Sequence, residues 1–255
     1  MSVLGNWLNR LSGSFVSHYS RQPKSKPDLS ILPRSVAEIA QTVQEKGLTY
    51  LPTQKLTGLL SLAIEMEQRQ EPGTFVEAGC ALGGSAIALT SCKRHDRPFL
   101  VYDVFGMIPP PSDLDGDDVH KRYEVISSGQ SVGINGNRYY GYENDLHSKV
   151  TNSFSHMGFP IESHGVSLVK GLVADTLTDD QPVSLAHIDV DWYEPVTVCL
   201  ERIVPRLTSH GAIVLDDYSD WSGCHSATND FFDRVGRDQF SFDSSAGHLV
   251  VRRAK

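Results

Sequence analysis

Apolar residues along this chain recur at two spacings, one typical of helices and the other of strands. Two amphipathic helices are predicted first, SVAEIAQTVQEKG, which ends at Gly47 as a C-cap, and TQKLTGLLSLAIEMEQRQ. Short apolar runs then predict strands, and amphipathic runs predict further helices. The predicted strands are TFVEAGC, FLVYDVF, SLVKGLV, VSLAHID and GAIVLDD, and the further helices are GGSAIALTSCKRH, PVTVCLERIVPRL and SATNDFFDRVG.

The order of these elements predicts the fold class. Strands that alternate with helices of about 10–15 residues indicate a parallel sheet with helices on both faces. The last two predicted strands, QFSFD and HLVVRR, are joined by the short link SSAG, which suits an antiparallel hairpin at the sheet edge. We therefore predict one doubly wound α/β domain over residues 35–255, with a mostly parallel sheet.

Residues 1–34 differ from the rest of the chain. Apolar residues recur there at helical spacing, Arg10, Arg21, Lys24 and Lys26 make the segment basic, and no acid precedes Asp28. A membrane-surface helix and a cleaved targeting segment are two interpretations. We favour a third, a helical arm that packs on its own domain or on a partner subunit, followed by an irregular linker.

A long segment, residues 106–165, separates the second and third predicted strands and is rich in Gly, Pro, Asp, Ser and Tyr. Segments of that length usually form lids or binding loops, and we predict a partly ordered lid. Its stretch DLDGDDVHKRYE resembles a calcium loop, but Asp118 stands where that loop needs Gly, so an acidic helix start explains it better. The cluster Tyr139, Tyr140 and Tyr142 could stack on sugars or pack the lid.

Composition and charge exclude several classes of protein. The 255-residue chain has a formal net charge of −8, which argues against a general nucleic-acid binder. The chain contains no apolar run long enough to predict a transmembrane helix. Its four cysteines, Cys80, Cys92, Cys199 and Cys224, show no paired spacing. We therefore expect reduced thiols in a reducing, cytoplasmic setting.

The loop in VEAGCALGGSA is the first candidate binding site. Gly79, Gly83 and Gly84 lie between a predicted strand and a predicted helix, where a cofactor could approach the backbone or the helix could pack tightly. Asp103 ends the next strand, where an acid in nucleotide-binding α/β folds accepts hydrogen bonds from ribose hydroxyls. Together with Glu77 in the first strand, these residues indicate an adenosyl cofactor that needs no pyrophosphate.

Four carboxylates follow two later strands. Asp189 and Asp191 end VSLAHIDVD, and Asp216 and Asp217 end GAIVLDD. The ligand crevice of an open α/β sheet lies outside the carboxyl ends of its strands, so these acids should meet there. Their mutual repulsion would leave some protonated unless a cation is bound, and carboxylate ligands suit a hard ion such as Mg²⁺.

These motifs resemble the macrocin O-methyltransferase (TylF-type) family. The likeness rests on TFVEAGCALGGSA, YDVF, VKGLVADTL, HIDVDWYEP and GAIVLDDY, and runs from about Thr49 to the C-terminus. It implies a Rossmann-like fold, the cofactors S-adenosylmethionine and Mg²⁺, methylation of sugar hydroxyls on glycosylated natural products, and a homo-oligomer. It also adds Ser85 and Asp175 to the cofactor-binding residues.

Roles for the acids follow from this resemblance. We assign Asp189, Asp216 and Asp217 as metal ligands and Asp191 as the base that takes the hydroxyl proton, although Asp189 and Asp191 could exchange roles. His225, which follows the second acidic pair, is a rival base. His187 lies inside its strand and is better explained as a core histidine.

Two other classes of function compete with this interpretation. LAHIDVD matches the start of phosphatases of the haloacid dehalogenase type, in which the first Asp is the nucleophile. Trp192 is unusual for that motif, and the chain that follows is short for the remaining phosphatase motifs. A non-catalytic cofactor-binding module, held at a membrane by the N-terminal helix, is the second alternative.

Overall fold

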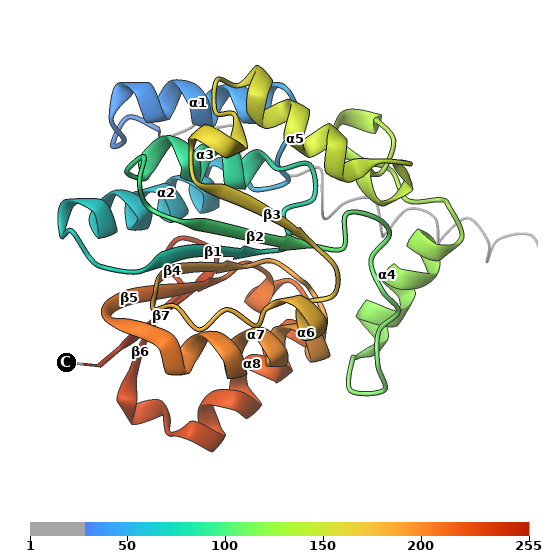
Figure 1. The fold of residues 1–255 in the computed structure, drawn as a ribbon. Coiled ribbons are helices and arrows are strands. Elements are labelled where there is room, and N and C mark those ends of the chain that lie inside the picture. Colours follow the sequence, from blue (N-terminus) through green and yellow to red (C-terminus); the bar gives the residue numbers. More distant parts are fainter. Residues whose placement is uncertain (1–28, 255) are drawn as a thin grey trace, which may run out of the picture.

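A single mixed sheet organises residues 29–254, the part of the chain that the computed structural model describes (Figure 1). Its seven strands lie in the order β3-β2-β1-β4-β5-β7-β6. The first five in this order are parallel, and β7 pairs antiparallel with both β5 and β6. The strands are β1 (Thr74–Ala78), β2 (Phe99–Asp103), β3 (Val166–Lys170), β4 (Val183–Ile188), β5 (Leu207–Leu215), β6 (Phe240–Asp243) and β7 (Leu249–Arg253).

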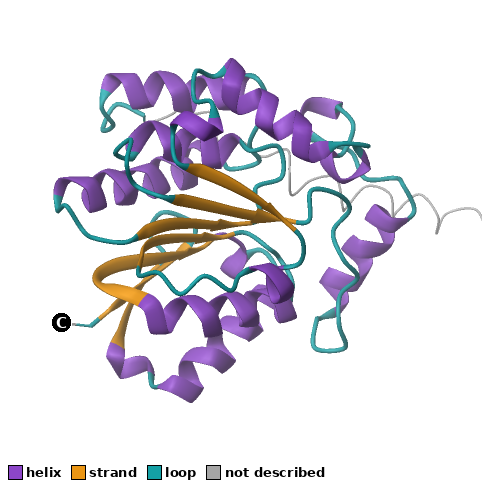
Figure 2. Ribbon diagram, in the orientation of Figure 1, coloured by secondary structure: helices purple, strands orange, loops and turns teal. Residues whose placement is uncertain are grey.

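Helices cover both faces of the sheet (Figures 1 and 2). One layer holds α1 (Arg34–Glu45), α2 (Thr53–Gln68), α3 (Gly84–Cys92) and α5 (Leu146–His156), and the other holds α6 (Val173–Thr176), α7 (Tyr193–Ile203) and α8 (Ser222–Val235). The remaining α-helix of the described chain, α4 (Asp117–Ser127), stands apart, beyond the carboxyl ends of the parallel strands. Single 3-10 turns are η1 (Ile134–Gly136), η2 (Tyr140–Tyr142), η3 (Ile161–Ser163), η4 (Val204–Arg206), η5 (Asp216–Ser219) and η6 (Arg237–Gln239).

The central strands are buried on both faces, as expected for a parallel sheet between two helical layers. Every residue of β1 is buried, and successive side chains point to opposite layers. Phe75 belongs to the core formed with α1, α2, α3 and α5, whereas Val76 belongs to the core formed with α7 and α8. This double burial accounts for the nearly continuous apolar runs of the sequence.

The structure confirms the predicted fold. Every predicted strand is present, and β6 and β7 form the expected antiparallel edge hairpin. Helix α1 ends as predicted, with Gly47 at φ +63° and its N–H donating to the Gln44 carbonyl oxygen at 3.0 Å. Cys80, Cys199 and Cys224 are buried free thiols. No helix among residues 29–254 is long and apolar enough to cross a membrane.

The predicted lid divides into two parts. Helix α5 packs against the main core through Leu146, Val150 and Phe154, so this part of residues 106–165 belongs to a helical layer. The preceding part contains α4, which begins at Asp117 with two acids in its first turn, as the acidic helix start predicted. Most of the predicted arm, residues 1–28, lies outside the described residues, so its role stays a prediction.

Candidate active site

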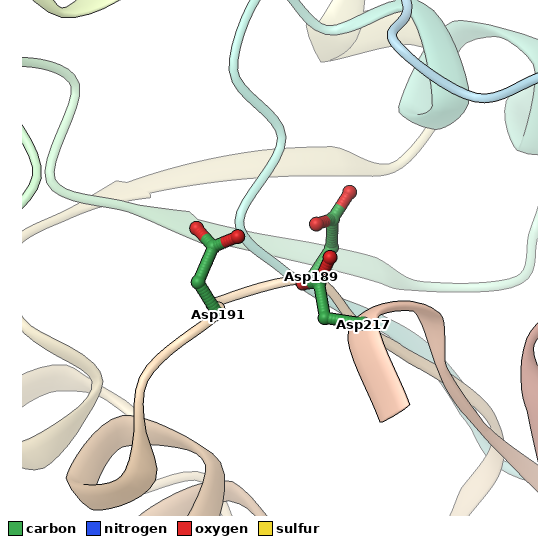
Figure 3. Close-up of side chains that lie close together, drawn as sticks. All are labelled: Asp189, Asp191 and Asp217. Carbon is green, nitrogen blue, oxygen red and sulfur yellow. The ribbon is translucent and has the colours of Figure 1, made fainter. Parts of the chain in front are cut away.

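Asp189 and Asp191 directly follow β4, at a turn that ends the strand. Asp189 continues the hydrogen bonding between β4 and β1 by one residue, since its N–H donates to the Ala78 carbonyl oxygen at 2.8 Å. Asp191 has φ +56°, a left-handed conformation that costs about 1–3 kcal/mol outside glycine. Both carboxylates extend to the same side of the chain (Figure 3), as side chains two positions apart do in a regular strand.

The next parallel strand brings a third carboxylate to this point. β5 pairs with β4, and η5 begins at Asp216 directly after it. Ligand oxygens of Asp189, Asp191 and Asp217 all lie within 4.8 Å of one another (Figure 3). Mg²⁺ binds oxygens at about 2.0–2.1 Å, so opposite ligands of one ion lie about 4 Å apart. The spacing of the three carboxylates therefore suits a small divalent cation.

Without such a cation the three acids resist ionisation. Burial, followed by the charge of Asp216, raises the pKa of Asp189 to about 8. Burial also raises the pKa of Asp191 to about 6, although Arg122 on α4 opposes part of this shift. The pKa of Asp217 is raised too, by burial and by the neighbouring carboxylates. A bound cation would relieve this repulsion, as the sequence pattern suggested.

Asp216, the remaining predicted ligand, lies beside this group with one oxygen engaged elsewhere. Its Oδ2 accepts a hydrogen bond from Lys55 Nζ at 3.1 Å. Its Oδ1 is buried and has no hydrogen-bond partner among residues 29–254, and the same holds for Asp217 Oδ2. Orphaned buried carboxylate oxygens are costly, so both atoms fit a site made to receive a cation.

Lys55 is a component of the site that sequence reasoning missed. Lys55 lies in the first turn of α2. Its ammonium also donates hydrogen bonds to the Asp216 carbonyl oxygen at 2.9 Å and to Asp220 Oδ2 at 2.7 Å. A lysine on the otherwise apolar face of KLTGLLSLA was the available signal, because a buried lysine needs an acidic partner. Nothing in the local sequence, however, identified that partner.

The glycine loop is shaped first by contacts within the protein. Gly79 and Gly83 both have φ +84°. A Cβ on Gly83 would lie 2.8 Å from Val150 Cγ1, and one on Gly84 would lie 2.4 Å from the Leu48 carbonyl oxygen. Tight packing, one of the two roles expected for these glycines, is therefore present. Cofactor binding by the same loop stays a prediction.

Asp103 braces this loop from the end of β2. Its Oδ2 accepts hydrogen bonds from the N–H groups of Cys80, at 2.8 Å, and Ala81, at 3.1 Å. Its Oδ1 accepts one from Phe105 N–H at 2.6 Å. The predicted ribose-binding acid thus lies at the expected edge of the sheet and fixes the turn that a cofactor would contact. Each oxygen retains acceptor capacity beyond these bonds.

Three further residues predicted to bind the cofactor have different surroundings. Glu77 is fully buried, with Oε1 lying 2.8 Å from Nδ1 of His187, its register partner on β4. Ser85 is buried in the first turn of α3, next to the glycine loop. Asp175 is exposed on α6, which follows β3. His187 is a core histidine as predicted, although its Nε2 has no hydrogen-bond partner within the described part of the chain.

His225, the predicted rival base, lies outside the group of three carboxylates. It is exposed in the first turn of α8, where its ring stacks on Tyr218 with centroids 4.7 Å apart. Its ring nitrogens lie 3.2 and 3.4 Å from Asn229 Nδ2. These contacts do not bring it to the carboxylates, and the structure offers no support for a role as base.

The segment before α4 is tied to the loops that bear the acids. Trp192 Nε1 donates to the Pro109 carbonyl oxygen at 3.0 Å, and Tyr193 N–H donates to Asp115 Oδ1 at 2.8 Å. Asp118 similarly accepts a hydrogen bond from Ser222 N–H at 3.0 Å, at the start of α8. Two acids of DLDGDD, Asp115 and Asp118, therefore hold this segment against these loops.

The tyrosines of the lid form a packed cluster. The Tyr139 ring lies 4.4 Å from that of Tyr140 and 5.1 Å from that of Tyr142, centroid to centroid. Tyr142 donates its hydroxyl to the Ile126 carbonyl oxygen at 2.6 Å, and Arg122 lies over the Tyr139 ring. The structure thus shows the packing role, one of the two interpretations left open by the sequence.

Solved structures with the same fold define the class of protein. The O-methyltransferase NovP superposes with a TM-score of 0.68 at 19% identity, covering 89% of this chain and 98% of NovP. The calicheamicin methyltransferase CalS11 superposes with a TM-score of 0.56 at 18% identity, covering 91% of this chain and 98% of CalS11. This likeness shows that the chain has the Rossmann-like fold of these proteins.

Sequence comparison then gives the family. Residues 15–239 match the family model described as Macrocin-O-methyltransferase (TylF), so the chain belongs to this family of S-adenosylmethionine-dependent O-methyltransferases. Its curated relative from Streptomyces olivaceus, 8-demethyl-8-(2,3-dimethoxy-alpha-L-rhamnosyl)-tetracenomycin-C 4'-O-methyltransferase, is 28% identical over 172 residues. That alignment covers 65% of this chain and 60% of the relative. Family membership favours a methyltransferase over the phosphatase and over the non-catalytic module.

Proposed function

We propose that this protein transfers the methyl group of S-adenosylmethionine to a hydroxyl of a sugar on a glycosylated natural product, with the help of Mg²⁺. The main observation behind this proposal is the convergence of Asp189, Asp191 and Asp217 at the carboxyl ends of β4 and β5. The family match supports the reaction, and the activity in the relative's name on a rhamnosyl group supports the acceptor class.

The cofactor would bind where β1 and β2 end. S-adenosylmethionine, when bound, supplies a methyl group on a positively charged sulfonium. In this chain Asp103 would accept hydrogen bonds from the ribose hydroxyls while it holds the Cys80–Ala81 turn in place. Gly79, Gly83, Gly84 and Ser85 would form the adjoining wall, with Glu77 behind it. Asp175 would complete the set from α6.

The metal would lie among the aspartates that follow β4 and β5. Mg²⁺, when bound, supplies positive charge that makes a nearby hydroxyl more acidic. We assign Asp189, Asp216 and Asp217 to hold it. Asp216 Oδ1 and Asp217 Oδ2 are buried and have no hydrogen-bond partner among residues 29–254, and Asp189 lies in one carboxylate group with Asp217. Lys55 fixes the other oxygen of Asp216 and so aims Oδ1 away from α2.

Asp191 would be the general base. Its carboxylate belongs to the same group of three, so a hydroxyl held near the ion lies within its reach. Its pKa, raised to about 6 by burial, makes it a stronger base than an ordinary aspartate and leaves it ionised at neutral pH. The left-handed backbone at Asp191 is strain of the kind that is often retained at functional sites.

Methylation of a glycosylated acceptor tests the proposed function directly. We would incubate the protein with S-adenosylmethionine and a panel of rhamnosylated aromatic polyketides, with Mg²⁺ or with EDTA, and detect methylated product by mass spectrometry. We expect product with Mg²⁺ and its loss in EDTA. Equal turnover in EDTA would refute the metal, and methylation of the aglycone alone would refute the acceptor class.

Two amide variants separate the ligands from the base. Asp191→Asn should lower kcat by about 10²–10⁴-fold, the range of general-base catalysis, while Mn²⁺ affinity changes little. Asp216→Asn should weaken Mn²⁺ binding at least about tenfold. The reverse pattern would make Asp191 the third ligand and exclude Asp216. Isothermal titration with Mn²⁺ and steady-state kinetics supply the two readouts.

A further inference from the structure

A second group of carboxylates adjoins the group of Asp189, Asp191 and Asp217 and shares Asp217 with it. Ligand oxygens of Asp216, Asp217 and Asp220 lie within 4.8 Å of one another, the same limit that the first group meets. Asp216 and Asp217 are buried, whereas Asp220 is exposed. Two such groups with a common carboxylate are what a two-metal site requires, in which the ions lie about 3.5–4 Å apart.

A lysine ammonium lies against this second group. Lys55 Nζ contacts Asp216 Oδ2 at 3.1 Å and Asp220 Oδ2 at 2.7 Å, and its third hydrogen bond, at 2.9 Å, goes to the Asp216 carbonyl oxygen. An ammonium has three donors, so these oxygens satisfy it completely. The side chain comes from α2, whereas the acids lie on the segment that follows β5.

The position of the ammonium matches that of a second ion. Lys55 is only 8% exposed, and a buried lysine needs acidic partners. Asp216 and Asp220 supply them at 3.1 and 2.7 Å. The ammonium therefore lies at the place where a second ion would neutralise the same carboxylates.

We propose that Lys55 occupies the second cation position and thereby limits the site to one divalent ion. The inference rests on the proposed function, because it takes the first position to be a metal site. With Lys55 present, Asp216 Oδ2 and Asp220 Oδ2 are engaged by its ammonium, which leaves Asp216 Oδ1 and Asp217 Oδ2 without a hydrogen-bond partner among residues 29–254. Removing the ammonium would free a complete set of ligands for a second ion.

The test counts Mn²⁺ ions per chain by electron paramagnetic resonance titration. The wild-type protein and Lys55→Arg, which retains a cation, should each bind one Mn²⁺. Lys55→Ala should bind two, with the line broadening of neighbouring ions. Adding Asp220→Asn to Lys55→Ala should return the count to one, because Asp220 belongs only to the second group. Circular dichroism checks that each variant is folded.

The outcomes separate this inference from the proposed function. Two ions in the wild-type protein, or one ion in folded Lys55→Ala, would overturn the inference and leave the proposed metal site intact. No bound Mn²⁺ in the wild-type protein would overturn both. Should Lys55→Ala fail to fold, Lys55→Gln replaces it: the near-isosteric amide lacks the charge, so a count of two supports the inference and a count of one refutes it.

Discussion

The carbonyl oxygen of Asp189 lies directly against the backbone of Gly79: a Cβ added to Gly79 would be 1.8 Å from that oxygen. This contact joins the proposed cofactor loop after β1 to the proposed metal ligand after β4. It leaves no room for any side chain at position 79. The first loop glycine is thus required by its contact with the Asp189 backbone, independently of any ligand that the loop binds.

Gly79→Ala should therefore destabilise the protein strongly. Left-handed strain of about 1–2 kcal/mol adds to overpacking of about 1–3 kcal/mol, giving a loss of about 2–5 kcal/mol in the free energy of unfolding. Gly129 is a matched control, because its φ is +77° and a Cβ there would meet nothing within 4 Å. Gly129→Ala should cost only the strain. Equal losses in urea denaturation would contradict the contact with Asp189.

Metal binding should stabilise the protein more at high pH than at low pH. The pKa of Asp189 is raised to about 8 and that of Asp191 to about 6, so at pH 6 protons compete with the ion for these oxygens. We expect the rise in Tm produced by excess Mg²⁺ to grow by at least about 3 °C, the equivalent of about 1 kcal/mol, between pH 6 and pH 8.

The metal-free protein should show the opposite trend. A carboxyl whose pKa is raised on folding holds a proton that the unfolded chain has lost, so stability falls as pH rises from about 4, the ordinary pKa of Asp, toward about 8. In EDTA we expect Tm to decrease across this window, and Asp189→Asn should flatten the decrease. A Mg²⁺-induced rise in Tm that is the same at pH 6 and pH 8 would contradict the raised pKa values.

The sequence predicted the strands and their carboxyl-end acids because both depend on local pattern. Buried parallel strands read as apolar runs, and the residues after them must lie at one edge of the sheet. It did not predict Lys55, because the pairing of α2 with the loop after β5 is a tertiary contact between positions 161 residues apart. The sequence also left open which of Asp189 and Asp191 is the metal ligand and which is the base. No glycine in DVD signals the left-handed backbone that the structure has at Asp191.

The buried pair of Glu77 and His187 should contribute strongly to stability. Burial by itself would lower the pKa of His187, but the hydrogen bond and charge of Glu77 raise it to about 9. Removing one partner of a buried pair typically costs about 3–5 kcal/mol, so Glu77→Gln should destabilise the protein by that amount at pH 7. In the wild-type protein, the stabilisation by the pair is complete below the ordinary pKa of His and is lost as pH rises through about 9.

Denaturation at two pH values tests this pair. The deficit of Glu77→Gln relative to the wild-type protein should shrink between pH 7 and pH 10, because over this range the wild-type protein loses the charge of His187 and with it the ion pair. Glu38→Gln is a suitable control, since Glu38 pairs with Arg34 on the exposed surface of α1 and should leave Tm unchanged. A deficit that does not depend on pH would show that His187 is neutral at pH 7.

Asp103→Ala should weaken binding of S-adenosylhomocysteine at least about tenfold, because the variant removes the proposed ribose acceptor and releases the Cys80–Ala81 turn. It should also lower stability, since three backbone N–H groups lose their acceptor. Calorimetric titration well below the lowered Tm separates the two effects. Asp175→Ala is the comparison: Asp175 is exposed, so that variant should keep its stability and lose affinity only if α6 contacts the cofactor. Unchanged affinity in folded Asp103→Ala would confine Asp103 to bracing the loop and would place the ribose elsewhere.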